Sequence, residues 1–235
     1  MKQLLLIFSF FILFSAEGRN KSFAGDSLNA HAILNKAIEA QGGKDFLGSI
    51  KTLYTNTVTR MDGIEVNWVV KEMLPNKGSF QVVNNNRILY QSWFDGKNGF
   101  EIVNGKKRKQ NTGENNDKIV KKNIISEMDY VDSSLWTIKL VGQENVLKQM
   151  CYKIYACSVN GIVKYLFYSK QSFLLLKEEK ILSPDLVYTF FFMSFAKQGQ
   201  LTFCNEIKLL KNGKYQEVRI LDMAINKNVD DTDFR

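Results

Sequence analysis

The sequence contains few of the residues from which catalytic and metal sites are built. It has one histidine, His31, so a Ser-His-Asp triad or a histidine-rich zinc site would have to form around that single side chain. His31 lies near the start of a segment with helical spacing, which favours a position on a helix surface. The sequence shows no nucleophile elbow and no cluster of metal ligands. We therefore expect a protein that is not an enzyme and uses no metal and no cofactor.

Cysteine is also scarce, and its positions form no redox motif. Cys151, Cys157 and Cys204 are an odd number, and no CxxC pair occurs. On one extended strand, Cys151 and Cys157 would face the same side about 20 Å apart, too far for a disulfide bond. Either of them could pair with Cys204 if their strands are neighbours. We favour the alternative, in which the cysteines are small buried apolar residues.

Three polar patterns that look like sites have a structural explanation. The Gly-Gly-Lys of QGGKDFLGSIKTLY (41–54) lacks Walker spacing and follows a helix, so we interpret it as a turn between two helices. Glu178 and Glu179 are adjacent on an expected strand and point to opposite faces, so they cannot act together as acid and base. The acidic tail NVDDTDF (228–234) lacks the spacing of a calcium loop and predicts a capped turn that packs Phe234 onto the domain.

The N-terminus has the pattern of an export signal. A basic start precedes an eleven-residue run at 4–14, LLLIFSFFILF, which is apolar except for Ser9 and is shorter than the roughly 20 residues of a membrane span. Cleavage fits after Gly18 or after Ala24, and we prefer the second position. We therefore expect a signal peptide at 1–24, a single domain at 25–235, and a periplasmic protein without a lipid-anchor cysteine. An uncleaved membrane anchor is the alternative.

The charge balance is mildly basic. Without residues 1–24, 29 Lys and Arg residues stand against 23 Asp and Glu residues, a formal charge of +6. The run KKRK at 106–109 could contact anionic head groups or an acidic partner. We favour a solvated hairpin edge, because lysines on edge strands discourage aggregation. Nucleic acid is not an expected partner of an exported protein.

The spacing of apolar residues predicts a mainly β (α+β) fold. Residues 26–40 predict a helix capped by Asp26 or Ser27 and ended by Gly42-Gly43, 44–51 a short second helix, and 114–131 a mid-chain helix of about four turns. From Thr52 the period is two, with Asn-Gly and Asp-Gly turns between the runs. The expected architecture is a strongly curved antiparallel sheet or half-open β-barrel of about eleven strands, whose concave face the helices cover.

Aromatic residues are plentiful, with 17 Phe, 9 Tyr and 3 Trp, and most of them fall in the expected strands. They could form an ordinary hydrophobic core, or part of them could line a cavity for a lipid or an acyl chain. The candidate residues for such an apolar ligand-binding cavity are Trp68, Phe80, Tyr90, Phe94, Tyr165, Phe167, Phe191 and Phe195.

The order of motifs resembles the bacterial outer-membrane lipoprotein-sorting proteins and their periplasmic relatives. The motifs are ILNKAIEAQGGKDFLGSIKTLY, SWFDGKNGFEIVNG, the mid-chain helix, TIKLVGQENV and GQLTFCNEIKLLKNGKYQEVRILDMAINKNVDDTDF, and together they cover residues 27–234. The resemblance implies a half-open barrel closed by helices, with a hydrophobic cavity for acyl chains and without catalysis or cofactor. Arg60 is the candidate counterpart of the arginine with which the sorting carriers control their lid.

The expected function is a periplasmic, non-catalytic carrier or binding protein for lipoprotein acyl chains or another lipid or apolar ligand. Helices 26–40 and 114–131 would shift to admit the ligand. Envelope membrane proteins are the expected partners, and the expected form is a monomer. The alternative is a structural or interaction subunit of an envelope complex, whose core is filled by its own side chains.

Overall fold

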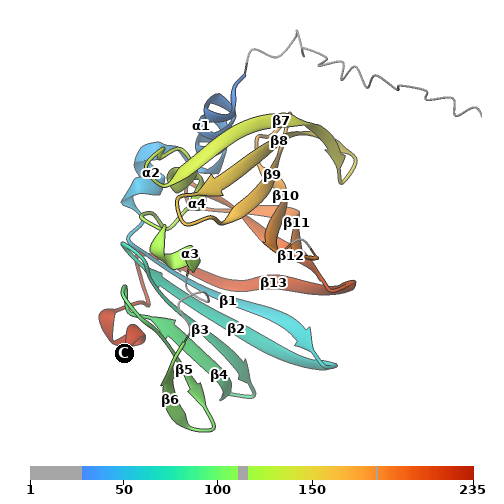
Figure 1. The fold of residues 1–235 in the computed structure, drawn as a ribbon. Coiled ribbons are helices and arrows are strands. Elements are labelled where there is room, and N and C mark those ends of the chain that lie inside the picture. Colours follow the sequence, from blue (N-terminus) through green and yellow to red (C-terminus); the bar gives the residue numbers. More distant parts are fainter. Residues whose placement is uncertain (1–27, 111–115, 184) are drawn as a thin grey trace, which may run out of the picture.

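The computed structural model describes residues 28–110, 116–183 and 185–235, so the expected signal peptide lies outside the described residues. The helices, drawn in Figure 1, are α1 (Ala30–Gln41), α2 (Lys44–Ser49), α3 (Asn116–Ile119), α4 (Ser126–Tyr130) and the 3-10 helix η2 (Asp231–Phe234). The strands are β1 (Thr52–Met61), β2 (Ile64–Met73), β3 (Lys77–Asn84), β4 (Arg87–Phe94), β5 (Gly99–Val103), β6 (Lys106–Lys109), β7 (Trp136–Val146), β8 (Gln149–Ser158), β9 (Val163–Ser169), β10 (Leu175–Ser183), β11 (Leu186–Gln198), β12 (Leu201–Lys211) and β13 (Lys214–Ile225).

The strands form one antiparallel sheet in the order β6-β5-β4-β3-β2-β1-β13-β12-β11-β10-β9-β8-β7. The prediction of a mainly β fold with N-terminal and mid-chain helices is confirmed. The finer prediction of a strongly curved half-barrel of about eleven strands is corrected, because the sheet has 13 strands, is open between its edges β6 and β7, and is not strongly curled. Every connection inside each half of the sheet joins neighbouring strands, and the β1–β13 pairing joins the two halves.

One of the additional strands is β6, which no alternation of apolar and polar residues predicted. All four of its residues, KKRK, are exposed, so no alternation of apolar and polar side chains marks it. Arg108 forms an ion pair with Glu101 at 2.6 Å, and the ammonium group of Lys107 lies 4.2 Å from the ring centre of Phe100. The run therefore forms a solvated edge strand, as predicted.

The first helix begins and ends at residues that satisfy its free backbone groups. Asn29 is the N-cap, and its side chain accepts a hydrogen bond from the backbone N–H of Ala32 at 2.9 Å. The expected caps at 26 and 27 lie outside the described residues. At the other end, the N–H of Gly42 bonds to Glu39, and Gly43 precedes α2, so the predicted turn between two helices is confirmed. His31 is exposed on α1, also as predicted.

The single mid-chain helix predicted at 114–131 is wrong, since the structure has two short helices, α3 and α4. Asp129 explains the interruption, because its carboxylate accepts hydrogen bonds from the backbone N–H groups of Lys122 and Asn123 at 3.0–3.3 Å. Those N–H groups would otherwise bond within a continuous helix, so the side chain competes with helical structure. Residues 114 and 115 lie outside the described residues.

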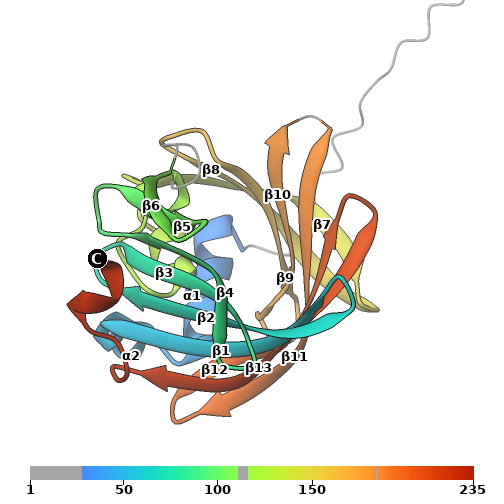
Figure 2. The same ribbon diagram turned by 90° about the horizontal axis from the view of Figure 1, so that it is seen from below.

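Helices α1, α2 and α4 lie on the same side of the sheet, which we call the helix face (Figures 1 and 2). Ile33 and Leu34 of α1 are completely buried against Ile154 of β8 and Leu166 of β9. A second cluster joins Leu47 of α2 to strands β12, β13 and β1. Tyr165 and Phe167 alternate with Leu166 along β9, so they point to the opposite side, which we call the outer face.

The acidic tail and the cysteines behave as the sequence suggested. Asp230 caps η2 in a capping box, and Phe234 is buried, which confirms the capped turn. All three cysteines are free. Cys151 and Cys157 lie on β8, which three strands separate from β12 with Cys204, so the sheet order places no two of them on neighbouring strands. Within the described ranges, no helix is both long and apolar enough to cross a membrane.

Candidate functional site

A cavity of about 280 Å³, the inner cavity, lies between α4 and the helix face of the sheet. Most of its lining is apolar, and it spans strands β1, β10, β11, β12 and β13. The lining residues are Gln41, Leu53, Thr55, Ile125, Ser126, Glu127, Tyr130, Leu174, Leu175, Glu178, Phe192, Phe195, Leu201, Thr202, Phe203, Cys204, Ile220 and Met223. Such a surface can accept an aliphatic chain, because apolar burial drives transfer from water.

The helical end of the inner cavity carries a small polar cluster. Tyr168 donates a hydrogen bond to Oε1 of Glu127 at 3.3 Å, and burial raises the pKa of that carboxyl group. The ammonium group of Lys164 pairs with Glu178 at 2.9 Å and donates to the hydroxyl oxygen of Tyr130 at 3.1 Å. Burial opposes the charged form of Lys164, but Tyr130 and Glu178 outweigh it and raise the lysine pKa. The polar groups are thus satisfied by one another.

A second cavity, the outer cavity of about 540 Å³, lies where the turns before β8 and β10 meet β11. It is lined by Leu147, Lys148, Gln149, Gln171, Ser172, Leu174, Leu176, Phe192, Met193 and Phe195. Leu174, Phe192 and Phe195 line both this cavity and the inner one. The two spaces therefore adjoin at these three side chains.

The eight predicted ligand-binding residues do not line one cavity. Trp68, Phe80 and Tyr90 form a row of ring contacts across β2, β3 and β4, with centroid separations of 5.7 and 6.2 Å. Phe80 and Phe94 line a separate cavity of about 250 Å³ beside α3. These residues lie far along the sheet from the inner cavity, whose lining begins at β1.

The other four predicted residues belong to the outer-face cluster. Tyr165, Phe167, Phe191 and Phe195 pack with Val146, Cys151 and Leu176. The ammonium group of Lys177 lies 3.8 Å from the ring centre of Phe167 and covers that ring. Of the eight residues, Phe195 lines the inner cavity, and its role in binding a ligand stays a prediction.

Sequence reasoning missed Phe192, Phe203 and Leu174. Phe192 stands beside the predicted Phe191 in LVYTFFFMSF, a run that is apolar on both faces, so alternation could not choose between them. Register shifts between Phe192 and Phe195 further change which side chains face inwards. Phe203 packs against the cluster that contains Leu47 of α2 and Met223 of β13, a contact that can be predicted only when the strand order is known.

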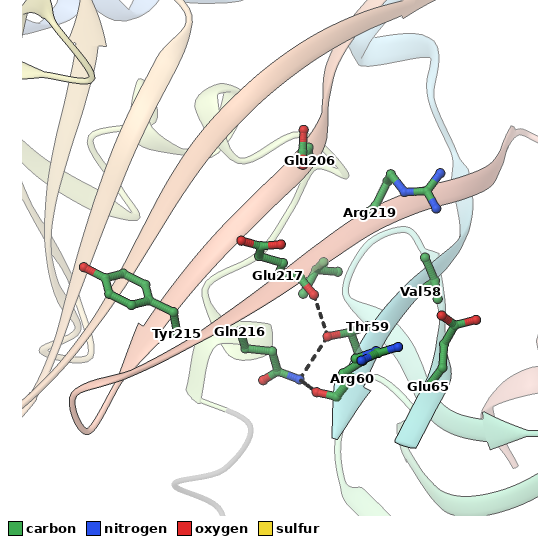
Figure 3. A pocket seen from close by; sticks show the side chains of 10 residues that line it. Val58, Thr59, Arg60, Glu65, Glu206, Tyr215, Gln216, Glu217 and Arg219 are labelled. Atoms are coloured by element: carbon green, nitrogen blue, oxygen red, sulfur yellow. Dashed lines mark hydrogen bonds between the residues drawn. The ribbon is translucent and has the colours of Figure 1, made fainter. Parts of the chain in front are cut away.

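Arg60, the candidate lid-controlling residue, lies in a third cavity of about 370 Å³ at the β1–β2 and β12–β13 turns (Figure 3). Thr59 donates a hydrogen bond to the carbonyl oxygen of Glu217 at 2.6 Å, and Gln216 donates to Thr59 and to the carbonyl oxygen of Arg60 at 3.1 and 3.3 Å. The lining comes from strands and their turns, with no described helical residue. The role of Arg60 as a lid-controlling residue stays a prediction.

In the described part of the chain, no group of three or more His, Cys, Asp or Glu residues could hold a metal ion. Glu178 and Glu179 point to opposite faces, since Glu178 pairs with Lys164 and Glu179 with Lys177. Glu127, whose pKa is raised by burial, bonds to Tyr168 of the same polar cluster.

The fold is that of the LolA-type lipoprotein-sorting proteins, as comparison with solved structures shows. A LolA superfamily protein from Nitrosomonas europaea matches with a TM-score of 0.62 at 15% identity, over 89% of this chain and 98% of that chain. A putative outer membrane lipoprotein-sorting protein domain from Vibrio parahaemolyticus matches with a TM-score of 0.59 at 10% identity, over 87% and 95%.

A DUF1329 family protein from Desulfovibrio piger is similar to the same extent, with a TM-score of 0.61 at 14% identity over 87% of this chain and 96% of that chain. No family model and no curated protein matches the sequence. The resemblance inferred from the motifs is thus confirmed as a structural match. At these identities the match concerns the fold, and the function has to be argued from the cavities.

Proposed function

We propose that the protein is a periplasmic, non-catalytic carrier or binding protein that holds an acyl chain of a lipid or lipoprotein in the inner cavity. The observation that carries this proposal is the inner cavity itself, about 280 Å³ with a mainly apolar lining under α4. Small-molecule sites occupy roughly 300–1,000 Å³, and the adjoining outer cavity of about 540 Å³ extends the space into that range.

The fold supports the same proposal. Two of the similar structures carry names that refer to LolA or to outer membrane lipoprotein sorting. The helix face of the open sheet would hold the acyl chain, with α4 as its cover. An N-terminal signal peptide at 1–24 would deliver the chain to the periplasm, where envelope membrane proteins would be its partners and a monomer its working form.

Cys204 offers a direct test, because it lines the inner cavity. Its thiol can be alkylated by N-ethylmaleimide, although burial raises its pKa and slows the reaction. A fatty acid bound in the inner cavity should protect Cys204 and leave Cys157, which lines neither the inner nor the outer cavity, unchanged. Peptide mass spectrometry after timed alkylation measures both sites. Equal labelling of Cys204 with and without fatty acid would contradict the proposal.

Chain length gives a quantitative check of the driving force. Each methylene group that enters an apolar site contributes about 0.8 kcal/mol, or roughly a fourfold gain in affinity. Saturated fatty acids of increasing length should follow this slope until the cavities are filled. Lipid extraction from detergent-free periplasmic protein, compared with a matched control protein, should show enrichment of acyl-chain lipids. A flat length series without enrichment favours the alternative, a structural subunit that binds no ligand.

The polar cluster of Glu127, Tyr130 and Lys164 is the one observation that would favour an enzyme. Convergent groups with shifted pKa values are typical of catalytic sites. Here Lys164 is held by Glu178 and Tyr130, and Glu127 by Tyr168, so the cluster serves to position α4. Hydrolysis of a short acyl ester such as p-nitrophenyl butyrate should stay at the buffer rate, and turnover abolished by Glu127→Gln would reverse this interpretation.

A further inference from the structure

Strands β10 and β11 separate before they reach the helical end of the sheet. Their last backbone pair in that direction is Lys177 with Phe191. Beyond it, Leu175 pairs with Tyr168 of β9, whereas β11 from Phe192 onwards pairs with β12. Both strands also shift register here, between 175 and 177 and between 192 and 195. We call this interruption, bounded by 174–176 and 192–195, the split.

The side chains of the split reach both sides of the sheet. Leu175 packs against the core that contains α1, whereas Leu176 is buried in the outer-face cluster. Leu174, Phe192 and Phe195 line the inner and the outer cavity at once. The inner cavity lies on the helix face, so the two cavities meet across the sheet at these three apolar side chains.

We propose that the split is a lateral port through which one unbranched acyl chain passes from the outer cavity into the inner cavity. This inference rests on the proposed function and names the ligand class more closely. A gap between two strands suits a linear chain, whereas a rigid fused-ring sterol would have to force the strands apart. The backbone groups along the split do not pair with each other, so passage breaks no ladder hydrogen bond.

Movement of α1 is the costlier route into the inner cavity. Ile33 and Leu34 are fully buried, and exposing each of them costs about 1.5–3 kcal/mol. Opening the split requires only rotation of Leu174, Phe192 and Phe195. The port thus makes movement of α1 unnecessary.

The mouth of the outer cavity indicates where the polar end of the ligand rests. Its polar lining consists of Lys148, Gln149, Gln171 and Ser172, and Lys148 is the one charged residue among the lining residues of that cavity. A carboxylate or phosphate head group can accept hydrogen bonds there from an ammonium and from amides. The ligand class is therefore a single-chain anionic amphiphile, with its tail inside and its head at Lys148.

Stopped-flow fluorescence with cis-parinaric acid, a linear fatty acid that brightens in apolar surroundings, tests the port. Leu174→Trp should slow both association and dissociation by roughly tenfold, because a port residue changes the barrier in both directions. Leu174→Ala should accelerate both. Leu182→Trp is the matched control, since Leu182 is an exposed residue farther along β10 that lines neither cavity, and its rates should equal those of the wild type.

The outcomes separate the port from the proposed function. Absence of binding to the wild-type protein refutes both. Binding with wild-type rates in Leu174→Trp, or weaker binding caused by faster dissociation alone, overturns the port and leaves the carrier. Lys148→Gln should weaken cis-parinaric acid at least threefold while leaving a fatty alcohol of equal length unchanged. Equal affinity of Lys148→Gln for the acid overturns the head-group assignment.

Discussion

The carboxylate of Glu127 on α4 accepts a hydrogen bond from the hydroxyl group of Tyr168 on β9, with an Oη–Oε1 distance of 3.3 Å. No cation is paired with this buried carboxylate in the described residues, and Glu178 lies close enough to act against its charge. Burial, the largest effect, and Glu178 together raise the pKa of Glu127 above 4.5, although hydrogen bonds from Gln41 and Tyr168 act in the opposite direction.

We predict that Glu127→Gln stabilises the protein at neutral pH. The folded protein binds the Glu127 proton more tightly than the unfolded chain, so stability falls as pH rises from 4.5 to the raised pKa. Glutamine keeps an acceptor for Tyr168 without a charge. Thermal unfolding should give a higher Tm at pH 8, by about 2–4 °C for each kcal/mol gained, and equal values near pH 3. A lower Tm at pH 8 would show that the charge is needed.

Glu72 on β2 should respond in the opposite way. Burial raises its pKa, but Lys121 at 2.5 Å and Lys118 at 3.4 Å outweigh burial and hold the pKa below 4.5. Its stabilising effect is present above 4.5 and is lost as pH falls through the lowered pKa. Glu72→Gln should lower the free energy of unfolding by about 1–3 kcal/mol at pH 7, because two lysines lose their partner.

Urea unfolding at pH 7 and pH 3 measures this change, and the difference from wild type should shrink at pH 3. Glu217→Gln is the matched control, because its pair with Lys208 spans 3.4 Å and its side chain is 71% exposed. Exposed pairs of this kind contribute about 0–1 kcal/mol. An equal loss in both variants would mean that the burial of Glu72 has no special effect.

These charge pairs also show which features of the structure a sequence pattern can predict and which it cannot. The period-two runs predicted the strands because each alternates on a sheet face, and the Asn212-Gly213 turn has the positive φ values, 50° and 72°, that a tight hairpin needs. Glu72 meets Lys118 and Lys121 from 46 residues and more away along the chain, across the α3 contact. Neither a spacing nor a composition encodes such a contact.

The candidate site was harder to predict than the fold because side-chain direction depends on register. Phe191 and Phe192 are indistinguishable by residue type, yet Phe191 lies in the outer-face cluster and Phe192 lines the inner cavity. The register shifts that set Phe195 between both cavities arise from pairing with β12, which is a property of two strands. The mid-chain helix is likewise interrupted because the Asp129 side chain accepts a hydrogen bond from the backbone N–H of Asn123. That contact depends on the side-chain direction, which the sequence pattern does not give.

The Gly42-Gly43 turn predicts unequal effects of two alanine substitutions. Gly42 has φ 144°, and a Cβ atom there would lie 2.8 Å from the carbonyl oxygen of Gln200 and 2.9 Å from Phe46. Gly43 has φ 88°, and its Cβ would meet only Glu39 at 3.4 Å. We expect losses of roughly 2–4 kcal/mol for Gly42→Ala and roughly 1–2 kcal/mol for Gly43→Ala, with more for Gly43→Val.

Gly48, inside α2, is the control for this pair. A Cβ atom at Gly48 would lie 3.9 Å from Met128, an ordinary contact. Gly48→Ala should therefore stabilise the protein by about 0.5–1 kcal/mol, since alanine favours the helix and restricts the unfolded chain. Chemical denaturation of the three alanine variants gives the comparison. The turn assignment would be refuted by a wild-type midpoint for Gly42→Ala or for Gly43→Val.

Asn226 lies just after β13, where the last strand meets the first. We predict that its substitution lowers the stability of the protein at this junction. Its side-chain oxygen accepts hydrogen bonds from the backbone N–H groups of Lys51 at 2.6 Å and Thr52 at 3.1 Å, and its amide donates to the carbonyl oxygen of Ser49 at 3.2 Å. These bonds satisfy the end of α2 and the start of β1 from 174 residues or more away in sequence. Asn226→Ala should lower the free energy of unfolding by about 0.5–1.5 kcal/mol, because two backbone donors at this exposed junction lose their side-chain acceptor.

Asn228→Ala separates the hydrogen bonds from backbone strain. Both asparagines have positive φ, 55° at Asn226 and 62° at Asn228, so alanine meets a similar strain at either position. The two variants, compared by urea unfolding, should differ by about 0.5–1.5 kcal/mol, with Asn226→Ala the less stable. Hydrogen exchange should locate the extra loss at the amides of Lys51 and Thr52. Equal stabilities would mean that strain alone explains the effect and that Asn226 does not hold the end of β13 to the start of β1.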